Sequence, residues 1–212
     1  MHPYFNGDAF EHFSQQVMAA LLPALSPERG DSQELRLLLL KKESTLRSTL
    51  PAHLTTSSVV LSPDGRQVLL LFHKKIGEWV YPGGHADGDW HLLRSALREC
   101  FEETGLERVE VLPPRHIPDP KVAIYCPHLF HRFVIKSNSR DPEHSHFDSV
   151  FVFRAHSKKA DFDPEESDDL CWVDLEVLQE HSLRQDRSVV GGIDALTARI
   201  CLSAMQSALG SM

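Results

Sequence analysis

The chain has 212 residues, of which 42% are hydrophobic and 25% charged, a composition that excludes collagen-like, low-complexity and disordered chains. Thirty acidic residues against 22 basic ones give a formal net charge of −8, which argues against a general nucleic-acid-binding or anionic-membrane surface. At about 150 residues per domain, the length predicts one domain with an extension.

Several sequence features indicate the cellular compartment. No apolar run approaches the roughly 18 residues that a membrane-spanning helix needs. Residues 1–8 show neither the basic nor the apolar region of a secretory signal. The four cysteines are far apart and follow no disulfide or metal-site spacing. We therefore expect a cytoplasmic protein with reduced thiols and with neither a membrane nor a nucleic acid as its partner.

Residues 1–50 are predicted to form a helical extension. Apolar residues recur at helical spacing over 10–21, and Pro23 ends that run. A second helix is predicted over about 31–46, and its leucines need a partner surface, either the main domain or a second copy of the chain. A homodimer formed through residues 1–50 is therefore one prediction.

Residues 51–212 are predicted to form the main domain, in which helices cover strands. β-Branched and apolar stretches on either side of the turn at 62–65 predict a β-hairpin. Helices are predicted over about 90–104, ended by Gly105, and over about 193–208. The predicted strands span 55–61, 67–73, 108–112, 129–135, 149–154 and 170–173. This order favours a layered α/β sandwich.

The predicted helix over 90–104 has one apolar face and one acidic face. Glu99, Glu102 and Glu103 fall together at about 100° per residue. Crowded carboxylates repel one another, and a cation that prefers oxygen ligands, such as Mg²⁺ or Mn²⁺, removes that cost. Arg98 directly precedes Glu99 in the sequence and is expected to pair with one of the three carboxylates. The alternative is a solvated acidic helix.

A longer pattern decides between these explanations. Gly84, five residues, Trp90, seven residues and then the run 98–106 closely resembles the signature of the Nudix hydrolases. That signature has Gly, five residues, Glu, seven residues, and then Arg-Glu-apolar-x-Glu-Glu-x-Gly-apolar. Every fixed position matches except Trp90, which stands where the family has Glu. The run 82–89 also looks like one bacterial branch of the family.

This resemblance implies an α/β/α sandwich with a mixed β-sheet, and an enzyme that hydrolyses a nucleoside diphosphate linked to another group. It also implies divalent cations, usually Mg²⁺, with Mn²⁺ as the alternative. By position, Glu102 and Glu103 are the expected main metal ligands, and Glu99 is a further ligand and a candidate general base. The Gly83 carbonyl is another expected ligand, and Arg98 is expected to orient Glu99.

An acidic loop precedes the predicted strand that contains Trp172. Nudix hydrolases often use a glutamate from such a loop near the metals. By this resemblance Glu166 is a candidate catalytic residue, with Glu165 second, and a solvated acidic turn is the alternative.

His144, His146 and Asp148 alternate with other residues, so on a strand they share one face. Such an array could bind a second cation or contact the substrate, and a polar sheet edge explains it equally well. Together with His85 and His131, it could also form a transition-metal site.

The residues predicted to bind substrate are His85, Arg132, His146 and Tyr125. Arg132 is a candidate phosphate contact and Tyr125 a candidate for stacking on a base, although solubility and a strand position explain them as well. Pro118 and Pro120 lie near the position where ADP-ribose hydrolases of the family carry a proline. ADP-ribose or a nucleotide sugar is therefore the favoured substrate, with a nucleoside triphosphate second.

Trp90 leaves two classes of function open. The first is a metal-dependent pyrophosphohydrolase, which is favoured because all three glutamates remain. The second is a nucleotide-binding or regulatory module that keeps the fold but has lost catalytic turnover because of Trp90. Asp87 and Asp89 are close enough in sequence to replace the missing carboxylate.

Overall fold

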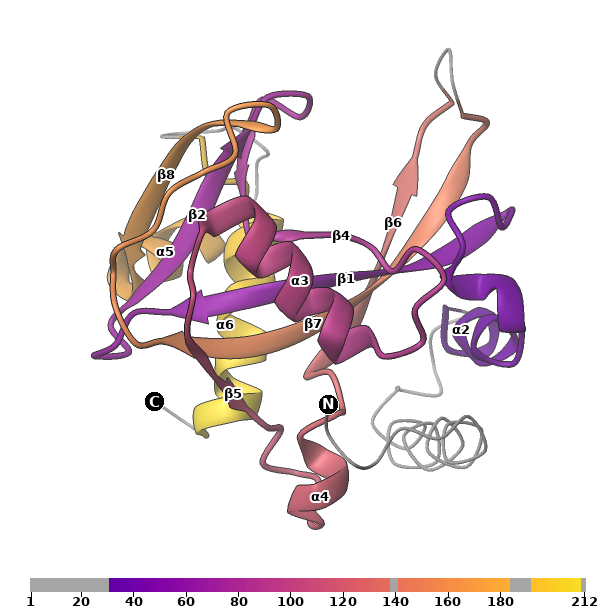
Figure 1. The fold of residues 1–212 in the computed structure, drawn as a ribbon, viewed down its shortest axis with the longest axis horizontal. Helices are drawn as coiled ribbons and strands as arrows, with labels where there is room; N and C mark the ends of the chain where they lie inside the picture. The colour runs from indigo at the N-terminus through magenta and orange to yellow at the C-terminus, as the bar shows by residue number, and fades with distance from the viewer. Residues whose placement is uncertain (1–30, 138–140, 184–191, 211–212) are drawn as a thin grey trace.

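The computed structural model describes residues 31–137, 141–183 and 192–210 (Figure 1). They form an α/β fold in which a curled, mixed β-sheet carries helices on both faces. The predicted helix over 10–21 lies outside the described residues. None of the described helices combines the length and the apolar character needed to cross a bilayer.

The elements follow one another along the chain as α2 (Asp31–Leu39), the 3₁₀-helix η1 (Lys42–Thr45), β1 (Ala52–Leu61), β2 (Gln67–His73), β3 (Glu78–Val80), β4 (Gly83–His85), α3 (Leu92–Thr104), β5 (Val109–Leu112), α4 (Pro120–Ala123), β6 (Leu129–Ile135), β7 (His144–Ala155), β8 (Ser167–Asp174), α5 (Leu175–Ser182) and α6 (Ala195–Leu209).

The sheet is organised around the parallel pair β1 and β7, whose register runs from Ala52 opposite Ser145 to Leu61 opposite Arg154. On its other edge β1 pairs antiparallel with β4, and it meets β2 at its far end. β7 also pairs antiparallel with β5 and β6, while β2 pairs with β3 and β8. Every residue of β1 is buried, as expected for a parallel strand that is covered on both faces.

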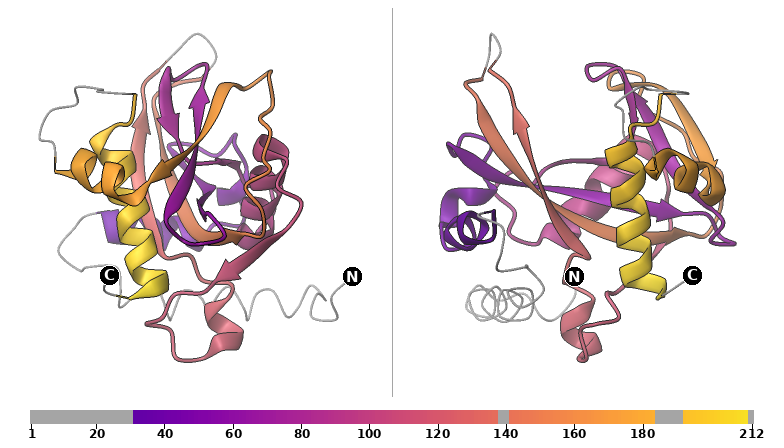
Figure 2. Two further views of the ribbon diagram at one scale, coloured as in Figure 1. Left: turned by 90° about the vertical axis from the view of Figure 1, so that its left-hand side faces the viewer. Right: turned by 180° about the vertical axis from the view of Figure 1, so that it is seen from behind.

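Helices cover the two faces of the sheet separately. Side chains alternate along β1, so Val59 and Leu61 join the core beneath α5 and α6, whereas Val60 joins the core beneath α3. Figure 1 shows α3 in front of the sheet, and the view from behind in Figure 2 shows α6 in front. The predicted α/β/α sandwich with a mixed sheet is confirmed.

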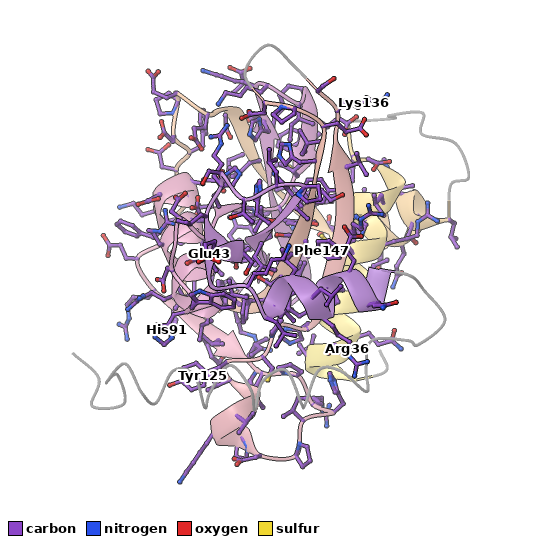
Figure 3. The ribbon with its side chains drawn as sticks, turned by 90° about the vertical axis from the view of Figure 1, so that its right-hand side faces the viewer. Arg36, Glu43, His91, Tyr125, Lys136 and Phe147 are labelled. Carbon is purple, nitrogen blue, oxygen red and sulfur yellow. The ribbon has the colours of Figure 1, made fainter. Side chains whose placement is uncertain are left out.

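The extension packs on the main domain through α2. Leu35 and Leu38 are buried against Leu54 and Phe147, and Figure 3 shows Phe147 next to this helix. The predicted helix over 31–46 is too long, because α2 ends at Leu39 and is followed by the separate turn η1. The next leucines along the chain, at positions 40 and 46, are exposed, so no apolar face continues the helix.

Other elements differ from their prediction for local reasons. β7 begins at His144 rather than at 149, since its pairing with β1 and β6 continues through polar residues. β4 was missed because Gly83 and Gly84 have little strand propensity. The strand β3 and the helices α4 and α5 were also missed. All four cysteines are unpaired, and three are buried: Cys100, Cys126 and Cys201.

Candidate active site

The helix α3 positions the acidic residues by burying its opposite side. Ala96 and Cys100 pack into the core formed with Phe151 and Phe153. Gly105 ends the helix in the left-handed conformation, with φ of 60°, and donates its backbone N–H to the Phe101 carbonyl. The acidic side of α3 is thereby turned toward β4.

The two glycines of β4 allow this approach. A Cβ atom added to Gly84 would lie 2.5 Å from Oε2 of Glu99. A Cβ atom on Gly83 would lie 2.2 Å from Oγ of Ser57 and 2.7 Å from the Thr56 carbonyl oxygen. Gly83 also donates its backbone N–H to Oε2 of Glu103 at 2.7 Å. A side chain at either position would overlap these atoms where they now lie.

Arg98 connects the carboxylates to the strand. Its Nη1 lies 2.9 Å from Oε1 of Glu99 and 3.4 Å from Oε2 of Glu102. Its Nη2 donates to the His85 carbonyl at 2.9 Å and lies 3.7 Å from Asp87. The expected orientation of Glu99 by Arg98 therefore has a contact that supports it.

Burial changes the proton affinity of two of the three glutamates. It raises the pKa of Glu103 to about 8, despite the hydrogen bond from Gly83, and Glu99 and Glu166 add repulsion. It raises the pKa of Glu99 to about 7, where Arg98 opposes the shift and Glu102 adds to it. The Glu102 side chain is 55% exposed. A buried and a partly buried carboxylate that repel each other form a site that favours a bound cation.

The loop before β8 adds a fourth acidic group. Glu166 raises the pKa of both Glu99 and Glu103 by repulsion, so its carboxylate lies within electrostatic reach of the pair. The Glu166 carbonyl accepts the backbone N–H of Lys74, which fixes this loop against the end of β2. Asp163 of the same loop also repels Glu103, a contribution that the sequence analysis did not anticipate.

A family profile described as NUDIX domain matches residues 51–190 of the chain. The protein belongs to the Nudix family. It is a Nudix pyrophosphohydrolase, a member of a class of enzymes that cleave diphosphate bonds. The residues matched include β4, α3 and the acidic loop, so the family match covers the whole of the candidate site.

Solved Nudix structures are similar to the chain. A Nudix hydrolase from Clostridium perfringens has a TM-score of 0.53 and 24% identity, covering 73% of this chain and 96% of that chain. The NUDIX domain of Shewanella oneidensis NrtR, complexed with ADP ribose, has a TM-score of 0.47 and 18% identity, with coverage of 82% and 97%. A C. elegans Ap4A hydrolase has a TM-score of 0.47 and 14% identity, covering 72% of this chain and 93% of that chain.

The residue that departs from the Nudix signature has a structural role. Trp90 packs against the apolar cluster formed by Leu35, Leu38, Ala52, Leu54 and Phe147 between α2 and the sheet. Asp89 binds the Arg94 guanidinium at 2.6 and 2.7 Å and accepts the His91 backbone N–H at 2.8 Å. Asp87 is the nearer of the two aspartates to the carboxylates, through Arg98.

The predicted substrate residues occupy different parts of the Nudix domain. Arg132 lies 3.5 Å from Glu34 of α2, and its guanidinium carbon lies 5.9 Å from the centre of the Phe147 ring. Tyr125 follows α4 and lies at the opposite end of the molecule from Lys136 in Figure 3. His85 and His146 lie together, with their ring centres 5.2 Å apart.

The structure gathers a histidine cluster that the sequence analysis identified only in part. His53, His85 and His146 offer ligand atoms that all lie within 4.8 Å of one another. Asp148 is not one of them, since it accepts hydrogen bonds from Thr55 at 3.0 Å and Ser57 at 2.9 Å. His131 stacks on Phe133 instead. His53 was missed because only the parallel pairing with β7 brings it opposite His146.

Proposed function

We propose that this Nudix pyrophosphohydrolase cleaves the diphosphate bond of a nucleoside diphosphate linked to another group, with Mg²⁺ or Mn²⁺ as the cation. ADP-ribose or a nucleotide sugar is the favoured substrate, and a nucleoside triphosphate is second. The observation that carries this proposal is a pair of carboxylates, the buried Glu103 and the partly buried Glu99, held against the double glycine of β4.

The donor set fits a hard divalent cation. Glu99, Glu102 and Glu103, with the Gly83 carbonyl, would hold it, because carboxylate and carbonyl oxygens are the ligands that Mg²⁺ prefers. A bound cation would neutralise charge on the nonbridging oxygens of the diphosphate. Burial, with a smaller contribution from repulsion between the carboxylates, raises the pKa of Glu99 and Glu103, and this cost of ionising them is what the charge of the cation would offset.

Glu99 is our candidate for the general base. In the metal-free chain burial raises the pKa of Glu99 to about 7, and a general base is most effective when its pKa lies near the working pH. Arg98 holds Oε1 of Glu99 at 2.9 Å and so fixes the direction of the carboxylate. Glu166 is the second candidate, since it acts on the same carboxylates from the loop before β8.

The assignment of substrate contacts follows from chemistry. Arg132 is proposed to contact phosphate, because its ion pair with the half-exposed Glu34 can be exchanged for a substrate anion. Tyr125 is proposed to stack on a base. His85 and His146 are proposed to lie beside the substrate, since the His85 carbonyl is held by the same Arg98 that orients Glu99.

Product release from a panel of nucleoside diphosphate derivatives and nucleoside triphosphates, measured with and without Mg²⁺, tests this function. We expect Mg²⁺-dependent turnover of ADP-ribose or a nucleotide sugar. Glu102→Gln removes an expected metal ligand and should lower the rate at least about tenfold. The loss should be smaller than for a buried ligand, because the Glu102 side chain is 55% exposed. A turnover rate that changes neither on removal of the cation nor in Glu102→Gln would contradict the proposal.

The regulatory alternative is tested by restoring the family's glutamate. Trp90→Glu places a carboxylate beside the apolar cluster under α2, so we expect it to destabilise the protein by about 1–3 kcal/mol in urea unfolding. We expect no gain in turnover. If Trp90→Glu converted a silent, nucleotide-binding protein into a hydrolase, the natural chain would be the weakened module instead.

A further inference from the structure

We propose that His53, His85 and His146 form a site for a transition-metal ion, most suitably Zn²⁺, that is separate from the carboxylate site of α3. Imidazole nitrogens suit zinc and its neighbours, whereas the oxygen ligands of α3 suit Mg²⁺. The chain would then carry two metal sites of different chemistry on either side of the short strand β4.

The sheet register brings the three rings together. His53 of β1 lies directly opposite His146 of β7, and Thr55, two residues along β1, lies opposite His85 of β4. The three ring centres form a triangle with sides of 4.6, 5.2 and 5.3 Å. Three separate strands therefore each direct one imidazole toward the same point.

The hydrogen bonds leave lone pairs available at this point. Nδ1 of His53 lies 3.1 Å from the Thr49 carbonyl oxygen, so in the uncharged ring Nδ1 carries the hydrogen and Nε2 has the lone pair. This Nε2 is buried and has no hydrogen-bond partner among the described residues, on a side chain that is only 1% exposed. A buried nitrogen without a partner is costly, and a metal ion would satisfy it.

A similar relay orients His146. Nδ1 of His144 lies 2.8 Å from the Pro142 carbonyl oxygen, and its Nε2 lies 3.1 Å from Nε2 of His146. With uncharged rings, His146 donates through Nε2 and keeps its lone pair on Nδ1. Backbone carbonyls thus orient the ligands from outside, as is usual around metal-bound histidines. Burial also lowers the pKa of His53, of His85 to about 4 and of His146 to about 3.

The three histidines can hold an ion after a small movement of their side chains, and the charges around them permit it. Tetrahedral zinc with Zn–N of about 2.0–2.1 Å needs ligand atoms about 3.3–3.4 Å apart, so side chains now within 4.8 Å must close in slightly. His85 is only partly buried, which leaves solvent access for a fourth ligand. Asp87 and Asp141 offset the positive charge of Arg47 near the rings, and Arg47 is itself paired with Asp141 at 3.3 Å.

The ion would act as a clamp that joins β1, β4 and β7. Because the His85 carbonyl accepts the hydrogen bond from Arg98, fixing β4 also fixes the residue that orients Glu99. The histidine residues are therefore positioning residues for the carboxylate site, and their metal affinity does not depend on whether that site turns over a substrate.

Metal binding to the full-length, untagged protein tests this inference. After removal of metals by dialysis against a chelator, Zn²⁺ is titrated by calorimetry in millimolar Mg²⁺, which occupies carboxylate sites. We expect one Zn²⁺ per chain, and Co²⁺ in its place should give the visible absorption bands of a tetrahedral nitrogen site. His53→Gln should weaken Zn²⁺ binding on the order of 100-fold or more and remove these bands.

Two controls separate the sites. His128→Gln removes another buried imidazole, outside the cluster, and should leave the stoichiometry unchanged. Glu102→Gln should also leave Zn²⁺ binding unchanged, so a failed hydrolase proposal would not affect this result. If His53→Gln does not fold, the partly buried His85→Asn replaces it. Absence of Zn²⁺ binding to the natural chain, or equal binding by the histidine variants, would overturn the site.

Discussion

Gly84→Ala is expected to lower turnover on the order of 100-fold while the protein stays folded. The added Cβ would lie 2.5 Å from Oε2 of Glu99, which is the far end of a flexible side chain. Glu99 can move away at little cost in stability, but it then leaves the position that Arg98 gives it. A displacement of about 1 Å at a catalytic group is enough for such a loss. Steady-state kinetics and thermal unfolding measure the two effects.

Gly83→Ala is the matched control, because its Cβ would also meet the backbone of β1, which cannot move away as the end of a side chain can. It would lie 2.2 Å from Oγ of Ser57 and 2.7 Å from the backbone oxygen of Thr56. We expect this variant to lose about 1–3 kcal/mol of unfolding free energy, as overpacked cores do. Equal stability losses for both variants, or full activity of Gly84→Ala, would show that the glycines do not have these separate roles.

Glu103→Gln is expected to abolish most activity, by about 10²–10³-fold or more, and yet to stabilise the metal-free protein near pH 8. The amide oxygen can still accept the Gly83 N–H, so the loop keeps its anchor. What the variant loses is a buried charge that repels Glu99 and Glu166. Denaturation at several pH values, with the divalent cations chelated, measures the gain.

The sign of the pH dependence follows from the raised pKa. Burial raises the pKa of Glu103 to about 8 in the folded chain from its ordinary value of 4.5, so between these two values the folded state binds the extra proton. The contribution of Glu103 to the stability of the metal-free chain must therefore fall as pH rises through this window, and Glu103→Gln should remove it. Buried histidines with lowered pKa values, such as His85 and His146, act in the opposite direction below pH 6.5, so the difference in stability between the natural chain and Glu103→Gln is the quantity to compare. Glu99, with a pKa of about 7, leaves part of the slope in place.

Mg²⁺ provides the complementary result for the natural chain. A cation that binds the ionised carboxylates stabilises the folded state more at pH 8 than at pH 5, so its shift of the melting temperature should grow with pH. Glu103→Gln should reduce this growth. A stability difference between Glu103→Gln and the metal-free natural chain that does not grow from pH 5 to pH 8, or an Mg²⁺ shift without pH dependence, would contradict the burial of Glu103.

Several features of this protein follow from local sequence alone: the acidic face of α3, the first hairpin and the family signature. The acidic face of α3 follows from the 3.6-residue period, and Gly105 sets its end. The hairpin of β1 and β2 follows from turn chemistry between apolar runs. The spacing from Gly84 to Leu106 identified the family, because metal-site spacing along one strand, loop and helix is a property of the chain itself.

Tertiary structure alone decided what depends on distant pairing. The strand β4 exists because β1 binds it, even though its glycines disfavour a strand. In the sequence Trp90 is a departure from the glutamate of the Nudix signature, and only the packing of α2 shows that it belongs to an apolar cluster. His53 and His146 are far apart in sequence, and the parallel register of β1 and β7 makes them neighbours. Burial, which shifts the pKa of Glu99 and Glu103, likewise requires the assembled layers, because desolvation is a property of the fold.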